Sequence, residues 1–298
     1  MASFIMAGRG QAAFFVILST LLSLIILPPI GLFSGAAIAL ITLRVSWQQG
    51  LVYALLGSAV FAIIAYLSEQ EGSLDLNIGL IGWLPIVFFA AILAKTSSWK
   101  RTLQAILATS ITGILLFKLY QPEPTVFWET TLLQFKPILQ EAYKLGSTEV
   151  DKLIQSMSRW MTGVFSAVIT ITLVLALLLA RHWQAMLYNR GGFAKEFRQL
   201  RIGKIPASII LVCIVLAILL KNTLAIEILI VAVGIFMLQG IALVHNIVYQ
   251  FKMKTGWLVA LYVLLFILLV QMFVLLAAFG IIDNFVDFRR KLPQKDQN

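Results

Sequence analysis

The sequence predicts an all-α membrane protein, a polytopic transmembrane helix bundle of about nine spans with an amphipathic extracytoplasmic helical hairpin. Its 298 residues are 60% hydrophobic and only 12% charged, whereas about a quarter of the residues of a soluble domain are charged. The apolar residues form long blocks, and about 20 of them in a row match the ~30 Å hydrocarbon core of a bilayer. Because backbone amides in lipid must be paired within their own segment, these blocks are expected to be helices.

The chain begins like a signal peptide, with Arg9 before an apolar run over residues 12–30. That run is longer than a normal signal core and continues into another apolar segment, so we expect a retained first span. The uncharged part of the second segment, 31–43, would be only about 20 Å long as a helix, which favours a half-buried or re-entrant segment. The first five spans, within residues 1–120, are expected at 11–27, 30–47, 51–67, 77–94 and 102–119.

Residues 121–159 interrupt the membrane pattern with a polar stretch in which apolar residues recur at helical spacing. Gly146 is expected to end a helix, and Thr148 with Asp151 resembles a capping box that opens a second helix. The pattern predicts an amphipathic hairpin that lies on the membrane or over a vestibule, or else a packed surface connector.

The last four spans, within residues 160–298, are expected at 161–180, 206–220, 224–250 and 257–282, with a basic loop at 181–205. All of residues 1–298 are expected to form a single membrane domain. If the N-terminus is cytoplasmic, the inner loops hold thirteen basic residues and one acid, and the outer loops hold six basic residues and eight acids. This bias predicts that orientation, and we expect a bacterial cytoplasmic (inner) membrane protein.

The C-terminal tail is the exception to this charge bias, because nine crossings would put Arg289, Arg290 and Lys291 outside. Two explanations are open. Either the tail folds back as an interfacial helix, or the short second segment does not cross the membrane.

The net charge of +10 does not indicate a nucleic-acid partner, because the basic residues lie in short loops between apolar blocks. The expected partner is the lipid bilayer. The chain has two histidines, one cysteine and no P-loop, and no catalytic residue, metal site or cofactor is expected. Cys213 lies within an apolar block and is expected to be a packing residue. We therefore expect a protein that is not an enzyme.

Polar residues within the spans are the candidate ligand-binding residues, since polar and charged groups in a bilayer usually face a cavity or a partner. Glu227 is the acid that lies within an apolar block, although a carboxylate so near the outer boundary could also reach the headgroups. Gln239, Asn246 and Gln250 share one helix face, with His245 beside it. Such a stripe either lines a polar cavity or bonds to neighbouring helices.

Two further segments are candidate interfaces. Gly31 and Gly35 form a GxxxG pattern, which lets helices approach closely within the chain or with a partner subunit. In the basic loop, apolar and basic side chains alternate at the spacing of a short amphipathic helix, which would lie on the anionic inner leaflet or dock a cytoplasmic partner. The residues assigned to this loop surface are Arg181, Phe193, Lys195, Phe197, Arg198 and Arg201.

Three stretches, 27–44, 181–193 and 280–290, together resemble the YybS-like predicted membrane proteins, a family of unknown function. The second stretch reads RHWQAMLYNRGGF, and Arg190 stands where members of that family have proline. The family is distantly similar to the substrate-binding membrane subunits of energy-coupling-factor transporters. The resemblance implies a helical bundle that captures a small molecule and works with a coupling subunit and a separate ATPase.

The leading functional hypothesis is a transport-related membrane protein that binds a small solute or lipid-like molecule within the helix bundle. The alternative is a non-transporting membrane scaffold or assembly partner that docks through its basic cytoplasmic loop. The hypotheses differ in whether the polar stripe lines a cavity or is used in bonds between helices.

Overall fold

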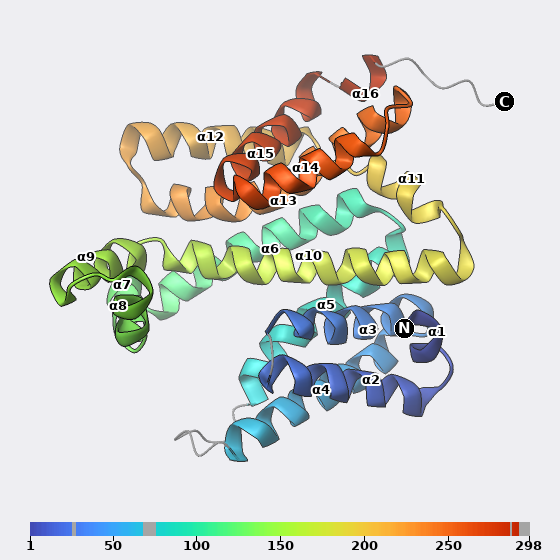
Figure 1. Cartoon of the computed structure of the whole chain (residues 1–298), viewed down its shortest axis with the longest axis horizontal. Helices are drawn as coiled ribbons and strands as arrows, with labels where there is room; N and C mark the ends of the chain where they lie inside the picture. Colours follow the sequence, from blue (N-terminus) through green and yellow to red (C-terminus); the bar gives the residue numbers. More distant parts are fainter. Residues whose placement is uncertain (26–27, 68–75, 287, 292–298) are drawn as a thin grey trace. The chain divides into compact units, whose positions relative to one another are not determined.

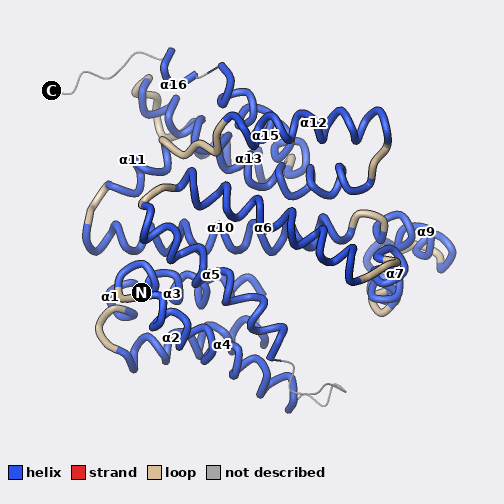
Figure 2. The backbone as a smooth tube through the Cα atoms, turned by 180° about the vertical axis from the view of Figure 1, so that it is seen from behind, coloured by secondary structure: helices blue, strands red, loops and turns tan. Residues whose placement is uncertain are grey.

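The computed structural model describes residues 1–25, 28–67, 76–286 and 288–291, and these residues form helices and connecting loops without a strand (Figure 2). The chain divides into two compact units. Unit 1 comprises residues 1–103 and 171–200, and unit 2 comprises residues 104–170 and 201–298. Helices α6 (Trp99–Tyr120) and α10 (Met161–Tyr188) contribute residues to both units. Each unit is described by itself.

Unit 1 is built around α3, a short helix of small and aliphatic residues. Its other helices are α1 (Ala2–Ile5), α2 (Arg9–Ile25), a 3-10 turn η1 (Pro28–Ile30), α3 (Gly31–Arg44), α4 (Trp47–Leu67) and α5 (Leu76–Thr96). Helix α3 packs against α2, α4 and α5 (Figure 1). Its residues from Ser34 to Thr42 are all buried. Because serine, glycine and alanine dominate the first half of this stretch, neighbouring helices approach closely.

The GxxxG pattern serves contacts within unit 1. A Cβ atom added at Gly35 would lie 2.7 Å from Ile86 on α5 and 3.4 Å from Ala176 on α10, whereas one at Gly31 would lie 3.4 Å from Ser23 on α2. Gly35 therefore lies at a tight contact between helices of the same chain. The Ser34 hydroxyl beside it accepts a hydrogen bond of 3.2 Å from the Trp83 indole.

Five helices of the described part are long and apolar enough to cross a membrane: within α4 (residues 47–64), α6, α10, α13 and α15. Five further apolar stretches are shorter, at residues 9–24, 31–44, 82–96, 204–220 and 256–267. The prediction of a helical, multi-span membrane protein is confirmed at this level. The exact number of nine crossings stays a prediction.

Residues 121–159 form three short helices: α7 (Pro124–Leu133), α8 (Lys136–Tyr143) and α9 (Ser147–Ser158). Leu132, Val150 and Ile154 make a small core between α7 and α9. Helix α8 ends at Lys144 with a left-handed backbone, φ 53°, instead of at Gly146. The capping carboxylate of α9 is that of Glu149, which accepts a 3.0 Å hydrogen bond from the Gly146 N–H, and not that of Asp151.

The basic loop is shorter than the sequence suggested. Helix α10 continues two turns past Ala180, so residues 181–188 are helical, and α11 (Gly192–Arg198) follows. Gly191 joins the two with φ +83°, a backbone conformation that glycine adopts without strain. The extension is possible because residues 181–188 contain neither glycine nor proline.

The remaining helices of unit 2 are α12 (Lys204–Leu220), α13 (Thr223–Gln250), α14 (Gly256–Ile267), α15 (Leu269–Val286) and α16 (Phe288–Lys291). The predicted ninth span is thus two helices, divided at Leu268, where φ is −114° and ψ is 49°. Neither glycine nor proline occurs at this break, so the sequence pattern did not predict it.

Helices α13 and α15 make the most extensive helix–helix contact of unit 2 (Figure 1). They cross at two glycines. A Cβ atom added at Gly240 would collide with the backbone of Leu276, and one added at Gly280 would collide with the carbonyl of Phe236. The two backbones therefore touch, as small residues at a membrane helix crossing allow.

Candidate functional site

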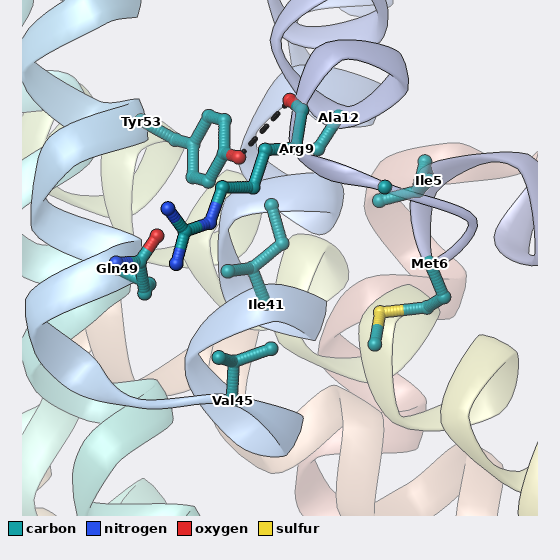
Figure 3. Close-up of a pocket in the computed structure, with 9 residues that line it drawn as sticks. Ile5, Met6, Arg9, Ala12, Ile41, Val45, Gln49 and Tyr53 are labelled. Atoms are coloured by element: carbon teal, nitrogen blue, oxygen red, sulfur yellow. Dashed lines mark hydrogen bonds between the residues drawn. The ribbon is translucent and has the colours of Figure 1, made fainter.

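A pocket that combines mostly apolar walls with a cation lies in unit 1, where α1, α2, α3 and α4 meet (Figure 3). Its volume is about 240 Å³. The walls are mostly apolar, and polar groups enter from one side. The lining residues are Ile5, Met6, Gly8, Arg9, Ala12, Ile41, Val45, Gln49 and Tyr53.

The pocket is shaped by the turn between α1 and α2. Arg9 is the first residue of α2, and its backbone carbonyl accepts a 3.1 Å hydrogen bond from the hydroxyl of Tyr53 on α4. This bond holds the start of α2 against α4. Ile41 and Val45, at the end of α3, supply the opposite wall, and Ile5 on α1 is buried.

The Arg9 guanidinium is the charged group of the pocket. Figure 3 shows it extended toward the side-chain amide of Gln49. Among the described residues, no carboxylate forms an ion pair with it. Arg44, the next cation along α3, instead lies 3.8 Å above the ring of Tyr188. Arg9 is therefore available to an anion.

A pocket of this composition fits an amphiphile with an acidic group. Binding pockets are mostly apolar, with a few polar groups that fix the orientation of the ligand. A guanidinium donates several hydrogen bonds and matches the geometry of a carboxylate or a phosphate. The volume is below the ~300–1,000 Å³ of typical small-molecule pockets, so it suits a headgroup or a short segment of a longer molecule.

Of the predicted ligand-binding residues, Glu227 lies in an ion pair. Its carboxylate is 2.9 Å from the ammonium group of Lys118 on α6, and the residue is 1% exposed. Gly163 on α10 packs directly on it, since a Cβ atom added there would lie 2.7 Å from the Glu227 Cα. The pair thus joins α6, α10 and α13 at one point.

Gln239 lies in a buried polar group that we call the Asp283 network: Arg201, Gln239, Asp283, Asn284 and Arg289. Gln239 accepts a 2.9 Å hydrogen bond from the Ile202 N–H and donates one of 3.2 Å to the Asp283 carboxylate. Gln239, Asp283 and Asn284 are each 0% exposed. This member of the predicted stripe is therefore used in bonds between α13, α15 and the loop that precedes α12.

Two arginines meet the Asp283 carboxylate. The Nε of Arg289 lies 3.2 Å and the Nε of Arg201 3.7 Å from Oδ2 of Asp283, and Arg201 also donates a 2.6 Å hydrogen bond to the Asp283 backbone carbonyl. Asn284 accepts a 2.8 Å hydrogen bond from the Gly203 N–H. The sequence analysis does not single out Asp283, because this residue directly follows the apolar block 257–282 that predicts a span. Its signal was an acid followed by a run of basic residues.

The other stripe residues do not share one partner. The His245 ring lies 2.9 Å from the Ile241 carbonyl and 3.3 Å from the Tyr262 hydroxyl on α14. In the described part of the chain, the buried side-chain nitrogen of Asn246 and the oxygen of Gln250 have no hydrogen-bond partner. The five candidate residues are thus distributed over several local environments along α13.

The predicted loop surface is also divided. Arg181 forms a bidentate pair with Glu196 on α11, at 2.9 and 2.7 Å, and a further hydrogen bond to Gln184. Phe193 and Phe197 stack at 5.9 Å. Arg201 belongs to the Asp283 network, whereas Lys195 is exposed and Arg198 is partly exposed.

Among the described residues, no three His, Cys, Asp or Glu side chains come together in a group that could hold a metal ion.

A comparison with protein families matches residues 13–284 to the family described as predicted membrane protein DUF2232. The chain belongs to this family. The predicted assignment to a family of uncharacterised membrane proteins is therefore confirmed for this DUF2232 protein. No curated protein and no solved structure matches the chain.

Proposed function

We propose that this DUF2232 protein is transport-related and binds a lipid-like molecule with an acidic headgroup at the unit 1 pocket. The observation that carries the proposal is the Arg9 guanidinium, which lacks an acidic partner in the described structure and borders a mostly apolar pocket of about 240 Å³. The acidic group would bind Arg9 and Gln49, while an apolar chain would leave along the walls formed by Ile41 and Val45.

The membrane setting supports this ligand class. Val45, an apolar residue of the pocket wall, is 59% exposed. A basic residue near a membrane surface gains about 1 kcal/mol from anionic lipid, and buried CH₂ groups add about 0.8 kcal/mol each. An amphiphile gains from both terms, whereas a free inorganic anion gains from only the first.

The test is native mass spectrometry with lipid analysis of the protein purified in mild detergent. Wild type is expected to retain an acidic amphiphile, and Arg9→Gln is expected to lose it. Val45→Trp, which keeps the charge and fills the pocket, should lose it too. Lys195→Gln is the matched control, since it removes an exposed cation outside the pocket. Equal retention by wild type, Arg9→Gln and Val45→Trp would contradict the proposal.

For the transport role we further propose a coupling subunit and an ATPase as partners, in line with the family resemblance. The alternative function is a scaffold that docks through the basic loop, and its support is the exposed α11 surface around Lys195. Purification from native membranes with identification of retained proteins separates them. An ATPase with a coupling subunit supports transport. An unrelated assembly that is lost on Lys195→Glu supports the scaffold.

We also propose a bacterial cytoplasmic membrane location, with the N-terminus in the cytoplasm and helices α7–α9 outside. The charge bias of the loops supports this orientation. In this orientation the Arg9 pocket faces the cytoplasmic leaflet, where anionic lipids attract basic residues. A reporter fused to the N-terminus that is active only in the cytoplasm tests the orientation. If the reporter is inactive at the N-terminus and active when inserted in α8, the protein has the opposite orientation.

A further inference from the structure

The last apolar segment of the chain is interrupted where a crossing helix would be continuous. Helix α14 has 12 residues and α15 has 18. At 1.5 Å per residue, α14 is about 18 Å long, well below the ~30 Å of the hydrocarbon core. The backbone of Leu268, with ψ at 49°, turns the chain between the two helices. The segment is therefore not one straight crossing.

The end of this segment is bonded to the loop that precedes α12. Asn284 accepts the hydrogen bond of the Gly203 N–H at 2.8 Å, and Arg201 donates to the Asp283 carbonyl at 2.6 Å. Gly203 is the N-cap residue directly before α12. The end of α15 and the start of α12 thus lie at the same end of unit 2.

The start of the segment lies at that end too. Helices α12 and α13 pack together and are joined only by Lys221 and Asn222, so they are antiparallel, and the end of α13 is on the side where α12 starts. Helix α14 follows after a loop of a few residues, and its Tyr262 hydroxyl lies 3.3 Å from His245 in the last turns of α13. The chain enters and leaves this segment on one side.

Side-chain exposure and charge agree with this path. The residues around the break are among the most exposed apolar side chains of the chain: Phe266 is 85%, Ile267 67% and Val270 67% exposed. Apolar side chains at a helix break are expected to contact lipid. The three basic residues 289–291 after α15 then lie on the side of the basic loop, as the distribution of positive charge requires.

We propose that α14 and α15 form a hairpin that enters the membrane and returns to the side from which it entered, so that the C-terminal tail lies on the same side as the basic loop. Complete crossings by α12, α13 and a ninth span would put the tail and this loop on opposite sides. The Asp283 network holds the returning end in place. The inference does not depend on the ligand of the unit 1 pocket.

The test is labelling of single cysteines in intact cells with a membrane-impermeant maleimide. The variants are Gln297→Cys in the tail, Gln199→Cys in the basic loop and Thr148→Cys in the α8–α9 region, each combined with Cys213→Ala. The Cys213→Ala chain, which contains no cysteine, measures background labelling. Size-exclusion chromatography checks that each variant is folded.

Gln297→Cys is expected to behave like Gln199→Cys: both protected in intact cells and both labelled after permeabilisation, while Thr148→Cys is labelled in both conditions. If Gln297→Cys is labelled together with Thr148→Cys while Gln199→Cys is protected, α14 and α15 together make a single crossing and the proposal is overturned. Because the comparison is between the tail and the loop, a reversed orientation of the whole protein would still leave the two positions on one side.

Discussion

The carboxylate of Glu227 on α13 lies 2.9 Å from the ammonium group of Lys118 on α6, in a chain region built mostly of apolar residues. Glu227 is 1% exposed, and the Lys118 side chain is 26% exposed. A buried charge destabilises the folded protein unless it is paired. Removing one partner of such a pair therefore costs more stability than replacing both partners with apolar residues. This difference can be measured.

Removing one member of the pair is expected to destabilise the protein more than removing both. Lys118→Met leaves the Glu227 carboxylate buried and alone, and breaking a buried pair costs about 3–5 kcal/mol. The double variant Lys118→Met/Glu227→Met should recover most of this loss. The measurement is thermal unfolding of the detergent-solubilised protein, followed by size-exclusion chromatography.

The matched control is the pair of Lys136 and Asp151, whose carboxylate is 47% exposed. Lys136→Met should cost less than about 1 kcal/mol, as exposed pairs do. A double variant as unstable as Lys118→Met would mean that the pair is not the source of the effect.

The crossing of α13 and α15 is expected to tolerate no side chain at Gly240. Gly240→Ala places a Cβ atom against the Leu276 backbone, which cannot move without displacing α15. Overpacking of this kind costs about 1–3 kcal/mol, and more where backbone is the obstacle. The thermal unfolding midpoint in detergent should fall.

Gly113→Ala on α6 is the control for this substitution. Nothing lies within 4 Å of a Cβ atom at Gly113, and alanine favours a helix over glycine by up to about 1 kcal/mol. We expect the unfolding midpoint to stay constant or rise. Equal effects at the two positions would contradict the close contact of α13 and α15.

Two glutamines on α13 should respond differently to the same substitution. Gln239→Leu removes the acceptor of the Ile202 N–H and a donor to Asp283, and leaving buried groups unsatisfied costs about 1–3 kcal/mol. Gln250→Leu removes a side-chain oxygen that has no partner in the described structure, so little stability should be lost. Unfolding in detergent compares them, and a larger loss for Gln250→Leu would overturn this account.

Helix α11 is expected to depend on the bidentate pair between Arg181 and Glu196. Lysine cannot reproduce the two parallel hydrogen bonds of arginine, which span 2.7 and 2.9 Å here. Arg181→Lys should weaken the contact by about 1 kcal/mol and speed local opening about fivefold. The readout is the rate of chymotrypsin cleavage at Phe193 and Phe197.

Arg190→Lys makes the same change at an exposed position beside Gly191 and should leave the cleavage rate unchanged. If Arg190→Lys changes the cleavage rate from that of wild type, or if Arg181→Lys leaves it unchanged, the pair does not hold α11.

The sequence predicted the helices better than their partners. Long apolar blocks with few charges located α4, α6, α10 and α13, since these properties are local. The ends were less certain: the helix that includes Met161 extends to Tyr188, because charged and polar residues are compatible with a helix that leaves the membrane. The polar segment 121–159 forms three helices instead of two. Helix α8 ends at Lys144, whose left-handed backbone the sequence pattern did not predict.

The candidate site shows the same division. Glu227 and Gln239 were singled out correctly as polar residues within a span, but their partners Lys118 and Asp283 are about 110 and 44 residues away along the chain. Arg9 was read as part of a signal-like N-terminus, and only the packing of four helices makes it the charged group of a pocket.

By itself, the sequence determined that this protein is a helical membrane protein of an uncharacterised family, because hydropathy and charge placement are properties of the chain alone. The tertiary structure decided which polar groups pair, where the pocket forms and that the last apolar segment breaks at Leu268. These features depend on contacts between residues distant in sequence. In the Asp283 network, Arg201 and Gln239, which are 82 and 44 residues away along the chain, meet the Asp283 carboxylate.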